Sequence, residues 1–132
     1  MAGPLISNAH TVWQGTLTEG TGVVNLDSSG AAKLDLAWAS RAEDHAGKTN
    51  PEELIGAAHS ACFSMALSNM LTGNDTPPQE LRTSAEVAFD IAEGGITGIH
   101  LTVVGKVDGL TPSDFETLAE TAKKECPVSK AL

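Results

Sequence analysis

The chain has 132 residues and a formal net charge of −9, with 8 Lys and Arg against 17 Asp and Glu. A chain of this length can bury one core, and its acidic balance repels phosphate backbones and anionic membranes, which argues against nucleic-acid or membrane partners. It has neither an uninterrupted apolar run of bilayer length nor a basic-then-apolar leader, so we expect a cytoplasmic protein.

The N-terminal third predicts three strands of an antiparallel meander. Residues 10–17 and 33–38 alternate polar and apolar side chains, and residues 22–26 follow a Gly-rich turn. Residues 40–50 are polar and contain glycine, so the sequence predicts a loop there.

A long helix is predicted after this loop. Asn50 is a good N-cap, Pro51 suits the first helical position, and Glu53 stands three residues past the cap. Residues 54–71 are apolar or small on nearly all sides, as in a helix buried centrally. The sequence therefore predicts a core helix that ends near Gly73.

Small residues recur at every fourth position of this helix, at Gly56, Ser60, Ser64 and Ser68. Residues at this spacing share one helix face, and small side chains let another backbone approach closely. We hypothesise that this stripe packs on another helix, such as its own copy in a dimer. The alternative is that small residues simply fit under a sheet.

The C-terminal half predicts a hairpin and two helices. Residues 81–92 and 96–107 carry apolar side chains at every second position, with a Gly-rich turn between them. Thr111 and Pro112 begin the next helix, and a short helix follows Cys126. The order βββαββα(α) predicts an α+β fold, with helices on an antiparallel sheet.

The two cysteines, Cys62 and Cys126, indicate either two buried thiols or a redox pair, since structural disulfides are rare in the cytosol. Cys62 lies in mid-helix, so a low thiol pKa there requires a nearby cation, for which His59 and Arg41 are candidates. A packed core histidine is the other reading of His59. Cys126 precedes Pro127 at a predicted N-cap, where backbone N–H groups favour a thiolate.

Two sequence blocks carry a family resemblance. Residues 50–68, NPEELIGAAHSACFSMALS, and residues 126–132, CPVSKAL, resemble the OsmC/Ohr family of osmotically inducible and organic hydroperoxide resistance proteins, and the OsmC branch most closely. Trp13, the strand meander and the Ser40-Arg41 step agree with this resemblance, which covers nearly the whole chain.

The resemblance implies a single OsmC-like domain over residues 1–132, in an intertwined homodimer whose two central helices are enclosed by sheets from both chains. It implies a peroxidatic Cys62, a resolving Cys126, an Arg41 that stabilises the Cys62 thiolate, and a Glu52 that holds Arg41 in place. Family members reduce organic hydroperoxides under oxidative stress, and in this branch also hydrogen peroxide. They are recycled by a dithiol reductant of lipoyl type, and no cofactor or metal is expected. Members of the family usually continue for a further strand after the second of these blocks, whereas this sequence stops at Leu132.

Helix geometry adds a constraint to these roles. Glu52 and Cys62 stand ten residues apart on one predicted helix, which separates them by about 15 Å along its axis. If both serve one site, Arg41 and Glu52 must come from the partner chain. We therefore expect two composite sites per dimer.

Three other functions remain open for the same residues. The cysteine pair could serve a thiol redox sensor or binding module that is oxidised without turnover. His59, Cys62 and Cys126 could form a metal site. A Cys-His hydrolase is conceivable, although no third residue or oxyanion turn is evident.

Overall fold

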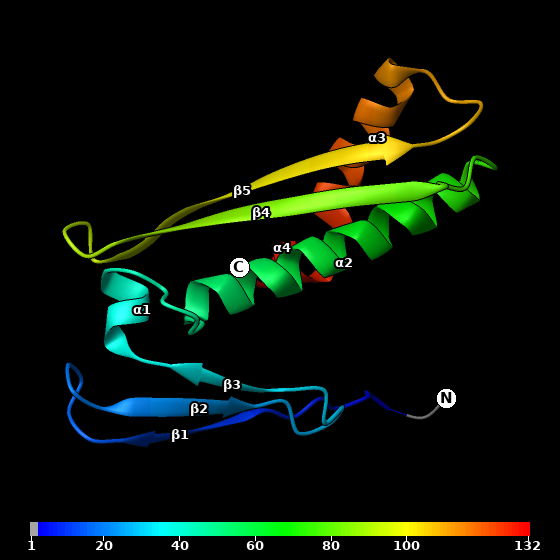
Figure 1. Ribbon diagram of the computed structural model, residues 1–132. Helices are drawn as coiled ribbons and strands as arrows, with labels where there is room; N and C mark the ends of the chain where they lie inside the picture. The colour runs from blue at the N-terminus through cyan, green and yellow to red at the C-terminus, as the bar shows by residue number, and fades with distance from the viewer. Residues whose placement is uncertain (1–2) are drawn as a thin grey trace. The chain divides into compact units, whose positions relative to one another are not determined.

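The computed structural model describes residues 3–132, which belong to two compact units, Met1–Glu53 and Leu54–Leu132. Figure 1 traces the helices and strands of each unit along the chain. The mixture of helices with antiparallel strands confirms the predicted α+β class.

The N-terminal unit contains a three-stranded antiparallel meander, as predicted. Strands β1 (His10–Gln14), β2 (Thr21–Asn25) and β3 (Lys33–Leu36) pair in the order β1-β2-β3. Trp13 stands opposite Gly22 in the register, and a Cβ built on Gly22 would lie 2.7 Å from the Trp13 ring. The glycine therefore makes room for the indole.

The segment after β3 corrects the sequence analysis. Helix α1 (Trp38–Ala42) covers residues that we expected to end a strand and begin a loop. Its start is fixed by Ser40, whose hydroxyl accepts the Ala37 N–H at 3.2 Å and lies 2.7 Å from the Thr49 carbonyl oxygen. One helical turn is too short to show a helical period in the sequence.

Helix α2 (Pro51–Gly73) begins where the sequence predicted. The side-chain Oδ1 of Asn50 accepts the backbone N–H of Glu53 at 2.8 Å, so Asn50 is the N-cap. Among the described residues, one helix, α2, is both long enough and apolar enough to cross a membrane. That is weak evidence for a span, because a core helix has the same composition, and Phe63, Leu67 and Leu71 of α2 are buried in the protein.

The hairpin is formed by β4 (Glu80–Asp90) and β5 (Gly95–Lys106), with a register shift between Ala88 and Phe89. Figure 1 shows α2 running along this hairpin. A Cβ built on Gly56 would lie 3.6 Å from the Cβ of Ala85, and the Ser64 hydroxyl lies 2.7 Å from the Thr83 hydroxyl. Two positions of the small stripe, Gly56 and Ser64, therefore pack against β4, as the alternative reading of small residues under a sheet expected.

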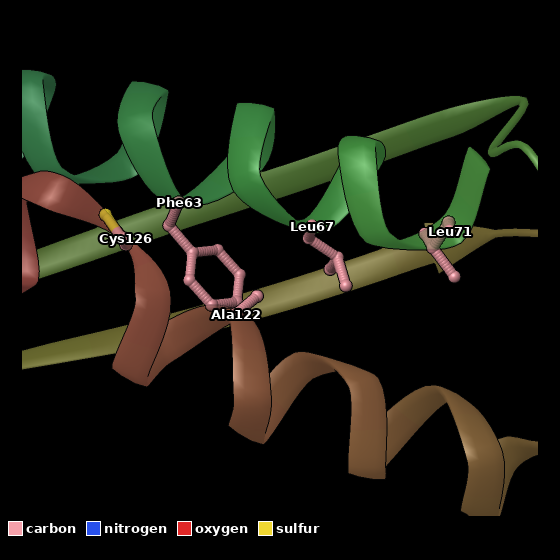
Figure 2. Packing of buried hydrophobic residues seen from close by; sticks show 5 residues of the cluster. All are labelled: Phe63, Leu67, Leu71, Ala122 and Cys126. Atoms are coloured by element: carbon pink, nitrogen blue, oxygen red, sulfur yellow. The ribbon is translucent and has the colours of Figure 1, made fainter. Parts of the chain in front are cut away.

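The core of the C-terminal unit lies between α2 and the last two helices, α3 (Pro112–Glu125) and α4 (Pro127–Ala131). Figure 2 shows three α2 side chains of this core, of which Phe63 points toward Ala122. The α2 residues recur at every fourth position, so they form one stripe on the helix: Phe63, Leu67 and Leu71.

Gly105 of β5 is a position where we predict a loss of stability on substitution. A Cβ there would lie 2.6 Å from the Phe115 ring and 3.2 Å from Leu81. Overpacking a formed core costs about 1–3 kcal/mol, so we expect Gly105→Ala to lower the free energy of unfolding by that amount. The measurement is urea denaturation, in which the midpoint should fall. Gly98→Ala is the matched control, because nothing lies within 4 Å of its added Cβ. Equal stability of the two variants would contradict the prediction.

Candidate functional site

The two cysteines meet in the C-terminal unit. Cys62 lies in the middle of α2, and Cys126 joins α3 to α4. Their side chains are hydrogen-bonded to one another, and both are free thiols. Cys126 is fully buried at 0% exposure, whereas Cys62 is partly exposed. The fold thus brings together two sulfur atoms that are remote in sequence.

Cys126 lies in surroundings that favour its thiolate. Burial raises the pKa of the Cys126 thiol, but hydrogen bonds outweigh burial and hold that pKa below its ordinary value. The donors are the Cys62 side chain, the Ser129 N–H and hydroxyl, and the Val128 N–H. The predicted donation by backbone N–H groups after Cys126 is present in the structure.

Cys62 has the opposite balance. Burial raises the pKa of the Cys62 thiol, the hydrogen bond and charge of Cys126 raise it further, and the Val128 N–H lowers it only in part. His59 is not among the groups that shift this pKa. The imidazole is 7% exposed, and its Nε2 lies 2.7 Å from the Ser129 hydroxyl. These contacts fit the packed-histidine reading of His59 and not a cation beside Cys62.

Arg41 and Glu52 form a two-point ion pair in the N-terminal unit. The Arg41 Nε lies 2.9 Å from the Glu52 Oε1, and Nη2 lies 3.0 Å from Oε2. The Glu52 side chain is 5% exposed and the Arg41 side chain 32% exposed. A buried carboxylate held at two points fixes the orientation of the guanidinium plane, and leaves part of that group accessible.

The predicted site residues therefore fall into two pairs, each within one unit. Arg41 from α1 meets Glu52 from the first turn of α2, and Cys62 meets Cys126. A chain with a paired thiol–thiol contact and a separate oriented guanidinium carries the groups needed for thiol redox chemistry.

Comparison with known proteins decides the family. Residues 43–132 match the family described as OsmC-like protein. The chain is 42% identical over 122 residues to Peroxiredoxin OsmC of Escherichia coli (strain K12), which covers 91% of this chain and 85% of that protein. The chain belongs to the OsmC-like family. The resemblance drawn from the two sequence blocks is therefore confirmed.

Other members of the OsmC-like family agree. The chain is 33% identical over 111 residues to the organic hydroperoxide resistance protein OhrA of Bacillus subtilis (strain 168), with coverage of 80% and 77% of the two chains. A solved organic hydroperoxide resistance protein from Elizabethkingia anophelis superposes with a TM-score of 0.72 at 26% identity, over 99% of this chain and 90% of that one. The fold is thus OsmC-like.

Sequence reasoning missed Ser129 in this OsmC-like chain. Its backbone and hydroxyl both contact Cys126, and its hydroxyl also contacts His59. The only available signal was a hydroxyl three residues after Cys126, which is one helical turn away and so on the same face of α4.

The metal alternative has no support from the side-chain geometry. Within residues 3–132, no group of three or more His, Cys, Asp or Glu side chains is arranged to hold a metal ion. His59, Cys62 and Cys126 do not form such a group, because the imidazole bonds to Ser129 and the thiols to one another.

Proposed function

We propose that this OsmC-like protein is a thiol peroxidase that reduces organic hydroperoxides and hydrogen peroxide. The observation that carries the proposal is the hydrogen-bonded pair of free thiols, Cys62 and Cys126. The names of its relatives, a peroxiredoxin and organic hydroperoxide resistance proteins, support the same substrate class.

Cys62 is the peroxidatic residue in this proposal, because it is the thiol of the pair that is partly exposed. Its thiolate attacks the distal oxygen of the hydroperoxide ROOH, the O–O bond breaks, and RO⁻ takes up a proton to leave as ROH. Cys62 becomes a sulfenic acid. The Cys126 thiolate then attacks the sulfenic sulfur, and hydroxide leaves as water once it is protonated, which yields the disulfide.

Arg41 is the proposed partner of the Cys62 thiolate. Burial and the neighbouring Cys126 raise the pKa of Cys62, so the attacking thiolate needs a cation that its own surroundings do not supply. A guanidinium whose plane is fixed by Glu52 can donate N–H groups both to the thiolate and to the peroxide oxygen that develops charge.

We further propose a homodimer of single OsmC-like domains, in which Arg41 and Glu52 of one chain serve Cys62 of the other. The spacing of Glu52 and Cys62 along one continuous α2 supports this arrangement. So does an exposed face of α2 on which Met65 is 74% exposed, accompanied by Ala58 and Ala61. A symmetric dimer would cover that face and contain two composite sites.

A dithiol of lipoyl type is the proposed reductant. One of its thiolates attacks the protein disulfide, which releases one protein thiol and forms a mixed disulfide. Its second thiol then attacks the mixed disulfide and releases the other protein thiol, so that both protein thiols are restored. Because the cycle ends with free thiols, it suits the reducing cytoplasm, which is the location we propose.

Counting peroxide consumed per chain tests the proposal. With excess cumene hydroperoxide and dihydrolipoamide, we expect consumption to continue for many turnovers. Without the dithiol, it should stop after about one equivalent per chain, because each disulfide stores one oxidising event. Consumption that stops at one equivalent even with the dithiol would instead favour the redox-sensor reading.

A further inference from the structure

Because the Cys126 thiol is buried, it cannot exchange its proton directly with solvent. It is 0% exposed and lies in the core beside Phe63, Leu67 and Leu71. The proposed cycle requires this thiol to lose a proton before it attacks the sulfenic acid, and to regain one when the disulfide is reduced. Solvent has no direct contact with its sulfur.

A chain of hydrogen bonds leads from Cys126 through Ser129 to His59. The Ser129 hydroxyl is hydrogen-bonded to the Cys126 side chain. The same hydroxyl lies 2.7 Å from the Nε2 of His59, a residue 70 positions earlier on α2. A hydroxyl can accept one hydrogen bond while it donates another, so Ser129 can pass a proton between its two neighbours.

The far end of this chain borders a cavity. His59 is 7% exposed, and among residues 3–132 its Nδ1 has no hydrogen-bond partner. Its ring lines a cavity of about 290 Å³ between α2, β5 and α3. The titratable groups that face this cavity are His100 from β5 and Glu120 and Lys123 from α3. His59 thus lies between a buried thiol and a mainly apolar cavity that also carries three titratable side chains.

We propose that Ser129 and His59 are positioning residues that relay the proton of Cys126 during disulfide formation. This inference rests on the proposed peroxidase cycle. Before the attack, the Cys126 proton passes to the Ser129 oxygen while the Ser129 proton passes to Nε2 of His59. This leaves a Cys126 thiolate that accepts a hydrogen bond from the Ser129 hydroxyl. The thiolate then attacks the Cys62 sulfenic sulfur. The S–O bond breaks, and hydroxide takes a proton from solvent at the exposed side of Cys62.

The relay runs in reverse when the dithiol reduces the protein. The S–S bond breaks, and the leaving Cys126 thiolate takes the Ser129 proton while protonated His59 returns a proton to Ser129. Each half-cycle therefore moves one proton between Cys126 and His59, and His59 exchanges it with solvent.

Single-turnover kinetics of Ser129→Ala test the relay. One equivalent of peroxide is mixed with reduced protein, Cys62 sulfenate is trapped with dimedone, and disulfide is counted by mass spectrometry after acid quench. We expect sulfenate formation at the wild-type rate and disulfide closure slowed by about tenfold or more, as for loss of a proton-transfer group. Closure should also require higher pH, because the Cys126 thiolate loses a hydrogen-bond donor and its pKa rises.

Two further variants separate a relay from a packing effect. Ser129→Thr keeps the hydroxyl and should restore most of the closure rate, whereas the exposed Ser113→Ala on α3 should behave as wild type. His59→Gln keeps a polar side chain that cannot take up the relayed proton, so disulfide closure should be slow while sulfenate formation keeps its wild-type rate. His100→Gln, exposed on β5 beside the same cavity, should keep the wild-type profile.

Two results would overturn the relay. One is wild-type closure rate and pH profile in Ser129→Ala, and the other is an equal slowing of sulfenate formation and closure. Failure of the peroxidase proposal itself looks different, because wild-type protein with dithiol present would then consume no peroxide or would stop at one equivalent per chain.

Discussion

Cys62→Ser should consume no measurable peroxide, while Cys126→Ala should form a sulfenate and then recycle poorly. A serine hydroxyl stays protonated at neutral pH and is a weak nucleophile, so we expect turnover to fall by on the order of 10³-fold or more in the first variant. The measurement is the steady-state rate of hydroperoxide loss with dihydrolipoamide present.

The second variant isolates the resolving step. Alanine suits position 126 better than serine as a probe, because Cys126 is fully buried among apolar side chains. Its intact mass should gain one oxygen at Cys62 and then a second, since no thiol traps the sulfenic acid before it is oxidised to the sulfinic acid. Normal turnover in Cys62→Ser, or a mass gain located on Cys126, would contradict the assigned roles.

Arg41→Lys should lower kcat/KM for hydroperoxide by about 10²-fold, as for loss of one directed donor in an active site. Lysine keeps the charge but cannot reproduce the two-point contact of the guanidinium with Glu52, at 2.9 and 3.0 Å. Arg82→Lys is the matched control, because Arg82 is an exposed arginine paired with Glu80 on β4. Equal activity of Arg41→Lys and the control would remove Arg41 from the proposed site.

Mixing two inactive variants tests whether Arg41 acts across a dimer. Cys62→Ser and Arg41→Ala chains are unfolded and refolded together. A mixed dimer with composite sites has one site that is wild type at both positions, so random pairing should restore about a quarter of wild-type activity. Sites contained within one chain would give no recovery on mixing.

The helix caps and the hairpin were predictable because each is specified by neighbouring residues. Asn50 caps α2 as its spacing from Glu53 indicated, and Thr111 accepts the Asp114 N–H at 3.1 Å at the start of α3. The alternation of β4 and β5 is equally local. In contrast, α1 was missed because five residues carry no helical period.

Contacts between distant segments were the part that the sequence could not specify. The stripe that includes Gly56 and Ser64 allowed either a helix or a sheet as its neighbour, and only the folded chain places β4 against it. The contact of His59 with Ser129 joins residues 70 positions apart, and no local pattern encodes such a pair. The meeting of Cys62 and Cys126 was expected from a family resemblance, and not from their spacing.

The position of Cys126 inside the apolar core links the chemical state of the protein to its resistance to unfolding. When Cys126 bonds to Cys62, a covalent loop closes from the middle of α2 to the start of α4. Cross-linking a loop of this length stabilises a folded chain by about 4 kcal/mol in the chain-entropy description. The oxidised protein therefore has the higher free energy of unfolding. The reduced protein, which is the form that reacts with peroxide, unfolds more readily and is cleaved faster by proteases.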